Sequence, residues 1–265
     1  MSSIYLCIKR LRVESANAFT SGTTINPAPI TAAVFFGHAL SRALNEEVSG
    51  VAYLHHDAQL LGERFKGMHF QPQQRRGAGY IDKNDYASTN KHALSLQPTA
   101  SFHLTVSLII RFDDEAEIDL NVVEQFLRGG RFAGGKIVDY AALTLLDPLS
   151  PTSGLPGGFW LIDRQDLLEG SSDHLRRLTH ILSAAPKGND HHPWLVLTSV
   201  GYAAITDAKP REYVRADYAH FFSEPMLGLV QFVSRRQYEK NRPKIPFWEL
   251  HWPTPQQCLI QQSQD

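Results

Sequence analysis

Glycines and basic side chains concentrate in the stretch FLRGGRFAGGKI, residues 126–137, which holds four glycines, two arginines and a lysine. Glycine permits a positive φ and close approach of another chain, and consecutive N–H groups in such a turn can bind an anion. Arg131 and Lys136 would place positive charge beside that turn. The spacing is not GxxxxGK[ST] and does not follow a strand, which disfavours ATP and NAD. Two interpretations remain: a loop that contacts phosphates, and a capped helix followed by a bend into a strand.

The second basic stretch is the polar segment 60–98, a long excursion between two predicted strands. Its six basic residues exceed its three acidic ones; they are Arg64, Lys66, Arg75, Arg76, Lys83 and Lys91. A long polar insertion of this kind is usually functional or disordered. The alternatives are a solvated loop and a hairpin that grips a nucleic-acid backbone.

Two smaller basic clusters lie elsewhere in the chain. One spans 232–244 and includes Arg235 and Arg236, and the other is the first predicted strand, with Lys9, Arg10 and Arg12. Charge runs of this type are more often solvated faces of helices or strands than binding sites.

The overall charge of the chain is nearly balanced. Lys and Arg number 26 against 27 Asp and Glu, so no global positive field indicates nucleic acid, and an anion site has to come from local clustering.

Histidines and cysteines give no recognisable metal or catalytic motif. The pairs His55–His56 and His191–His192 have no third ligand at a known spacing, and there is no HExxH or GxSxG. Cys7 and Cys258 stand at opposite ends of the chain, which fits a reducing compartment and predicts no disulfide framework. The sequence therefore requires neither an enzyme nor a cofactor, and we expect no metal.

The composition is that of an ordinary globular protein. Hydrophobic residues make up 43% of the chain and charged residues 20%. The chain has no apolar run as long as the roughly 18 residues that a membrane-spanning helix needs. We expect a soluble, cytoplasmic protein.

The elements that must position the basic clusters follow from the hydrophobic patterning. Strands are predicted at 4–13, 50–57, 101–112 and 136–146, and helices at 29–44 and around 117–128. The order is β-α-β, a long insert, then β-α-β, which predicts an α+β, ferredoxin-like fold with the topology of RNA-recognition domains. The Pro- and Gly-rich stretch 147–158 is the predicted linker. It separates a palm at 1–146, with an insert at about 60–98, from an α+β, β-rich extension at 159–265 that packs on the palm.

Five stretches in matching order resemble the Csy-two (Cas-five) family, a RAMP-superfamily subunit of type I-F CRISPR surveillance (Csy, or Cascade) complexes. They are RLRVESANAFTSG (10–22), AAVFFGHALSR (32–42), GVAYLHHDAQ (50–59), FHLTVSLII (102–110) and GRFAGGKI (130–137). The last looks like the family's signature of an arginine, an apolar residue and Ala-Gly-Gly. The chain is shorter than the members of the family, with a compact segment around 183–192.

The resemblance implies a RAMP palm and a thumb hairpin, which the insert would form, in a non-catalytic antiviral-defence subunit. Such a subunit binds and caps the 5′ handle of the guide (CRISPR) RNA, joins the backbone subunit to the large subunit, and supports recognition of target DNA and its flanking motif. The short chain fits the form that depends on a large subunit. The predicted RNA-binding residues are Asn17, Arg64, Lys66, Arg75, Arg76, Arg131, Gly134, Gly135, Lys136, Arg235 and Arg236.

Two other functions remain open. One is a metal-independent RNA endonuclease that processes repeat RNA with His56 or His103 and a nearby Lys or Tyr. The other is an unrelated ferredoxin-like interaction module, for which charge reversal of Arg75 and Arg76 would leave RNA association unchanged.

Overall fold

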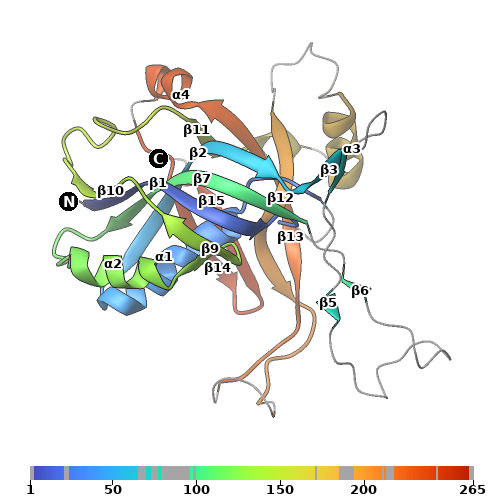
Figure 1. The fold of residues 1–265 in the computed structure, drawn as a ribbon. Coiled ribbons are helices and arrows are strands. Elements are labelled where there is room, and N and C mark those ends of the chain that lie inside the picture. The colour runs from blue at the N-terminus through green and yellow to red at the C-terminus, as the bar shows by residue number, and fades with distance from the viewer. Residues whose placement is uncertain are drawn as a thin grey trace.

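The computed structural model describes residues 3–20, 24–64, 70–72, 77–78, 96–97, 100–170, 172–184, 194–210, 212, 218–242 and 244–262. Within these residues the chain is α+β, with four α-helices and one large antiparallel sheet (Figure 1). The predicted α+β class is confirmed. No helix in the described part of the chain is long and apolar enough to cross a membrane.

The N-terminal half follows the predicted order of elements. They are β1 (Ile4–Asn17), α1 (Ile30–Leu44), β2 (Val48–Leu60), β3 (Gly62–Arg64), β4 (Phe70–Pro72), β5 (Gly77–Ala78), β6 (Leu96–Gln97), β7 (Ser101–Phe112), α2 (Leu120–Arg128), β8 (Arg131–Phe132), β9 (Gly135–Asp139) and β10 (Ala142–Leu146). Four of the strands lie in the order β9-β1-β7-β2, and all neighbours are antiparallel. The single strand predicted at 136–146 is divided at Tyr140 and Ala141 into β9 and β10, which pair with β1 one after the other.

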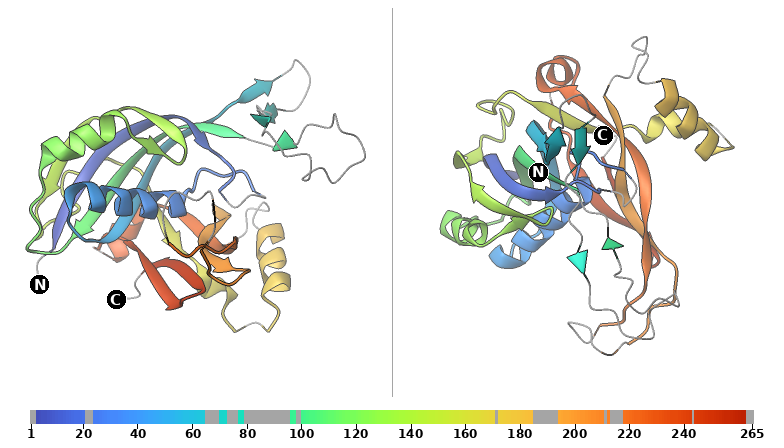
Figure 2. Two further views of the ribbon diagram at one scale, coloured as in Figure 1. Left: turned by 90° about the horizontal axis from the view of Figure 1, so that it is seen from below. Right: turned by 45° about the vertical axis from the view of Figure 1, so that its right-hand side comes forward.

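The C-terminal half adds strands to the same sheet. Its elements are β11 (Phe159–Asp163), the 3-10 helix η2 (Gln165–Leu168), α3 (His174–Ala184), β12 (Leu195–Ala204), β13 (Ser223–Ser234), α4 (Arg235–Asn241), β14 (Trp248–Thr254) and β15 (Gln257–Gln262). The path β11-β13-β12-β15-β14 begins and ends on β2, because β11 and β14 both pair with that strand (Figure 2). The two predicted domains thus share one sheet, and the boundary between them stays a prediction.

Side chains alternate between two faces of the sheet, and each face has its own core. On β1, Leu6, Ile8, Leu11 and Val13 are buried in the main core, which also contains buried residues of α1 and α2. Figure 1 shows these two helices next to each other on that face. Cys7 belongs to a second core on the other face, closed by segment 147–158, β11 and residues 245–247. This second core covers only part of its face.

The helix that leads into the glycine stretch is defined by its ends. The Asp119 side chain accepts a hydrogen bond from the Asn121 N–H at 2.8 Å, which caps the first turn, and Gly129 follows the last helical residue. The helix buries Val123 and Leu127. This packing fixes where the chain leaves α2 and enters β8.

Candidate nucleic-acid interface

The glycine stretch folds as a helix end followed by a tight β-hairpin. β8 and β9 pair through Arg131 with Lys136 and Phe132 with Gly135, so only Ala133 and Gly134 form the turn. Both have positive φ, +48° and +78°, as a type I′ hairpin turn requires. The helix end and the bend into a strand are therefore confirmed, while contact with phosphate stays a prediction.

The two hairpin glycines are required for different reasons. A Cβ on Gly135 would lie 2.6 Å from the Ala16 nitrogen and 2.6 Å from the Glu14 oxygen, so this glycine lets β9 approach the backbone of β1. A Cβ on Gly134 would have no other atom within 4 Å, and this residue needs glycine for its positive φ. Of the two glycines, only Gly134 leaves open space for a ligand to approach the backbone.

Arg131 and Lys136 are directly opposite on the hairpin, and both are exposed. Like charges in this position destabilise a strand pair. The Arg131 guanidinium donates to the Gly134 carbonyl at 3.1 Å, and Lys136 is in register with Glu14 on β1. Among the described residues neither cation forms an ion pair within 4.0 Å. The hairpin thus presents two cations whose charge the described protein does not neutralise.

Asn17 and the two roots of the insert lie at the same end of the sheet as the hairpin turn. The Asn17 backbone N–H donates to the Ala133 carbonyl at 2.7 Å, and Asn17 is in register with Ser101, the first residue of β7. The insert leaves β2 at Leu60 and returns at Ser101, where the Leu61 N–H donates to the Ser101 carbonyl at 2.9 Å. We call this the hairpin end of the sheet.

The Asn17 side chain turns back on the loop that follows it. Its oxygen accepts from the Phe19 N–H at 3.1 Å, and its amide nitrogen donates to the Phe19 carbonyl at 3.2 Å. Asn17 is exposed. The residue therefore shapes the hairpin end, and a direct RNA contact by Asn17 stays a prediction.

Most of the predicted thumb cluster lies outside the described residues. The backbone of Arg64 belongs to β3, where it pairs with Phe70 of β4. The Arg64 side chain and the whole of Lys66, Arg75 and Arg76 are not among the described positions. The contribution of these four residues to RNA binding stays a prediction.

Arg235 and Arg236 begin α4, and the structure places them differently. The Arg235 guanidinium pairs with Glu239 at 2.6 Å and donates to the backbone carbonyls of Thr152, Leu155 and Pro156. It is one-fifth exposed, at 19%, and it ties segment 147–158 to α4. This geometry favours a structural role, whereas Arg236 is exposed.

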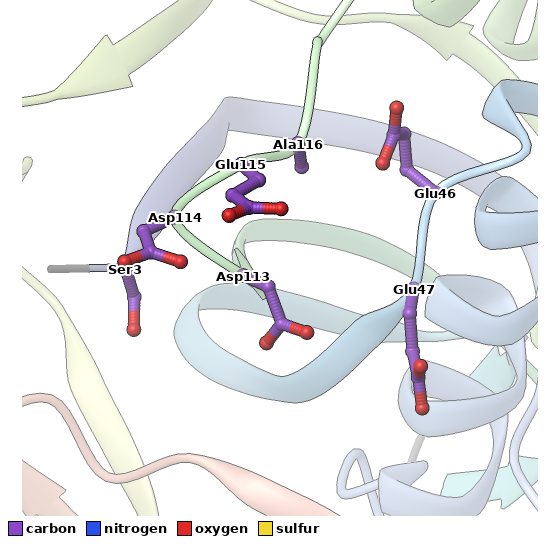
Figure 3. A pocket seen from close by; sticks show the side chains of 7 residues that line it. All are labelled: Ser3, Glu46, Glu47, Asp113, Asp114, Glu115 and Ala116. Atoms are coloured by element: carbon purple, nitrogen blue, oxygen red, sulfur yellow. The ribbon is translucent and has the colours of Figure 1, made fainter. Parts of the chain in front are cut away.

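The opposite end of the sheet is acidic. A cavity of about 470 Å³ lies between the α1–β2 and β7–α2 connections, and Figure 3 shows its carboxylates. They belong to Glu46, Glu47, Asp113, Asp114 and Glu115. Phosphate groups would be repelled there, so the sheet has an acidic end and a hairpin end that carries free cations.

The two histidines of the endonuclease hypothesis both form hydrogen bonds with other described residues. His56 Nδ1 lies 2.8 Å from the Gly157 carbonyl, and its Nε2 lies 2.7 Å from the Ser107 hydroxyl. Burial lowers the pKa of His56; the Gly157 hydrogen bond opposes this shift and the Arg10 charge adds to it. His103 Nδ1 accepts from the Ser15 N–H at 3.3 Å. The described residues contain no group of three or more His, Cys, Asp or Glu that could hold a metal.

Sequence reasoning missed that the first strand continues to Asn17 and contains two bulges. Register shifts fall between Ile8 and Leu11 and between Val13 and Ala16 on the β7 side. The signal was present in the sequence, because core residues on β1 are three apart at these two places where regular alternation puts them two apart. The bulges change which polar side chains share a face with the hairpin.

A model of the family described as CRISPR-associated protein (Cas_Csy2) matches residues 6–186, more than half of the chain. A comparison with curated protein sequences gives no match. The family match spans β1, the hairpin, the insert and the elements as far as α3, so it includes the whole hairpin end of the sheet. The chain therefore belongs to the Csy2 family of CRISPR-associated proteins and is a subunit of a multi-subunit Csy complex.

Proposed function

We propose that this protein is the non-catalytic subunit of a type I-F surveillance complex that binds and caps the 5′ handle of the guide RNA. In this role it joins the backbone subunit to the large subunit and supports recognition of target DNA. The observation that carries the proposal is the convergence of the hairpin turn, Asn17 and both roots of the insert at one end of the sheet. A strand of RNA at that end would meet all of them together.

The order of the strands supports a ferredoxin-like RAMP palm as the scaffold. Strands β9-β1-β7-β2 alternate in the chain with α1 and α2, whose buried residues join the core on one face. The insert follows β2 and precedes β7, and in this proposal it would form the thumb. In this arrangement the loops at one end of the sheet can hold a single strand of RNA. The face of the sheet opposite α1 and α2 stays free for partners.

The distribution of charge gives the direction of binding. Phosphates are attracted to Arg131 and Lys136, which lie opposite each other without an anionic partner within 4.0 Å in the described chain. They are repelled by the carboxylates around the cavity at the far end of the strands. Phosphate contacts fix the register of a bound strand, and each neutralised charge contributes a salt slope of roughly 0.7 for single-stranded RNA.

The test is a tagged pull-down from cells that express the protein with its neighbouring genes and a repeat array, followed by sequencing of the bound RNA. We expect uniform RNAs that begin with the repeat-derived 5′ tag. Arg131→Glu should abolish their recovery. Arg42→Glu is the control, because Arg42 is exposed on α1, the helix that packs on the main-core face of the sheet.

A matched pair at the turn separates charge from folding. Gly134→Asp adds an anion at a position with open space, and Gly134→Asn has nearly the same shape without the charge. Both residues tolerate positive φ better than other side chains do. Loss of the tagged RNA with Asp but not with Asn supports phosphate contact. Recovery of random RNA or of no RNA with the original protein would overturn the proposal. So would equal recovery of the tagged RNA with Gly134→Asp, Gly134→Asn and Arg131→Glu.

A further inference from the structure

Two bulges in β1 hold residues in strained backbone conformations beside one face of the sheet. Arg10 and Ser15 have φ of +50° and +56°, a region that costs a non-glycine residue about 1–3 kcal/mol. Each of them donates its backbone N–H to a side chain of β7: Arg10 to the Ser107 hydroxyl at 2.9 Å, and Ser15 to His103 Nδ1 at 3.3 Å. Bulges re-aim side chains near functional sites, so this strain calls for an explanation.

The bulge at Ser15 fixes the chemistry of His103. A backbone N–H can only donate, so His103 Nδ1 must be an acceptor and the neutral ring carries its proton on Nε2. His103 is half-buried. The residue therefore presents a ring N–H donor, which is held in orientation by the backbone of the neighbouring strand.

His103 shares its face with a set of polar residues next to the hairpin, most of which are exposed. Register places Lys136 beside Glu14, Arg12 between Asp139 and Thr105, and Gln59 beside His103. We call this set the open face; its members are Arg12, Glu14, Gln59, Asp57, His103, Thr105 and Lys136. The second core covers the same face only nearer the start of β1, so the open face is accessible.

Arg12 is a second cation of the open face beside Lys136, and its ion pair within the protein is weak. Its guanidinium lies 3.7 Å from the Asp139 carboxylate, and both side chains are 62% exposed. An exposed pair at this distance contributes little to stability. Arg12 is therefore available for an anionic ligand, and the carboxylate and amide oxygens nearby can accept from the amino groups of bases.

We propose that the open face is a second contact surface for the RNA strand, on which Arg12 binds a phosphate and the Nε2–H of His103 donates to the strand. This inference rests on the proposed function. Single-stranded RNA is recognised by such combinations of phosphate contacts and hydrogen bonds to exposed base edges and 2′-hydroxyls. The strand would run from the hairpin cations across β1 onto β7, and the two bulges would position its partners.

The test measures binding of a short fluorescein-labelled oligouridylate to the full-length protein by anisotropy at several salt concentrations. Arg12→Gln should weaken binding about three- to tenfold and reduce the salt slope by roughly 0.7. Arg42→Gln, on the opposite face, should leave both unchanged. Arg131→Gln reports on the hairpin in the same assay.

Two substitutions at His103 isolate its donor. Asparagine can still accept from the Ser15 N–H but has no donor at the place of Nε2, whereas glutamine retains a donor there. We expect His103→Asn to weaken binding about three- to tenfold and His103→Gln to bind like the original protein. Thermal unfolding of each variant checks that the fold is retained.

The outcomes separate the two proposals. Weaker binding with Arg131→Gln, Arg12→Gln and His103→Asn supports both of them. Weaker binding with Arg131→Gln alone overturns the open face and leaves the proposed function in place. Equal loss of affinity with both His103 variants overturns the role of the Nε2–H donor. If the oligouridylate does not bind, or binds all variants equally well, both proposals are overturned.

Discussion

Replacing Gly135 with alanine should destabilise the whole protein, because this glycine is where β9 meets β1. The added Cβ would lie 2.6 Å from the Ala16 nitrogen and the Glu14 oxygen, and 2.7 Å from the Ala16 Cα. All three are backbone atoms, so no side chain can rotate away to relieve the overlap. β9 must move off β1, which breaks the pairing of Glu14 with Lys136.

The size of the effect follows from this overlap. Overpacking costs about 1–3 kcal/mol, and each backbone hydrogen bond lost from β9 adds roughly 1 kcal/mol. We expect a loss of about 3 kcal/mol, which lowers Tm by roughly 6–12 °C in a chain of this size. Differential scanning fluorimetry measures it directly.

Gly134→Ala is the matched control, because its Cβ meets open space and only the positive φ is unfavourable. Its cost of about 1–2 kcal/mol predicts a smaller drop in Tm of roughly 2–8 °C. A Tm loss for Gly135→Ala that is no larger than the loss for Gly134→Ala would refute the packing argument.

Three further substitutions test other parts of the fold. Arg111→Met removes the 2.8 Å ion pair with Glu249 that joins β7 to β14, and should lower the free energy of unfolding in urea by about 2 kcal/mol. Arg235→Gln releases the carbonyls of segment 147–158 and should make that segment sensitive to limited proteolysis at unchanged RNA recovery. Burial lowers the pKa of His55 from 6.5 to about 4, so its contribution to stability is complete above pH 6.5 and is lost as the pH falls toward 4. His55→Phe should remove up to about 3 kcal/mol of that decline, measured by urea unfolding at pH 7 and pH 4.5.

Each of these predictions has its own control. Arg42→Met should change the unfolding free energy by less than about 0.5 kcal/mol, because Arg42 is a surface residue. Arg236→Gln is the neighbour control for proteolysis, and RNA loss with Arg235→Gln instead of increased cleavage would restore Arg235 as a binding residue. An unchanged pH dependence in His55→Phe would show that another group causes the decline.

The sequence predicts those elements whose apolar residues repeat at a clear period. Strands β2 and β7 and the helix α1 all lie where the pattern places them. The hairpin was predicted as a bend because its glycines are visible in the sequence, but the pairing of Arg131 with Lys136 depends on a turn of two residues, which the sequence alone did not specify.

What could not be predicted depends on contacts between distant residues. Arg235 belongs to a basic run, yet its guanidinium is directed to carbonyls about 80 residues earlier in the chain, and no local pattern reports such partners. The same holds for His103, whose tautomer is determined by the backbone of Ser15, 88 residues away. Long-range geometry thus decides which of the many basic and polar residues remain available for a ligand.

The hairpin pair is the clearest case of this selection. A strand pair with two cations directly opposite each other is less stable than one with opposite charges or with Thr at one position, by about 0.2–1 kcal/mol. The described protein offers neither residue an ion pair within 4.0 Å, although Glu14 stands in register with Lys136 on the adjacent strand. Two phosphates of one strand would remove this repulsion. Arg131→Thr should therefore raise Tm slightly in the absence of RNA and lose the stabilisation that added RNA gives to the original protein. A protein in which Arg131→Thr lowers Tm, or in which added RNA stabilises both forms equally, would show that the pair serves the fold and does not bind the ligand.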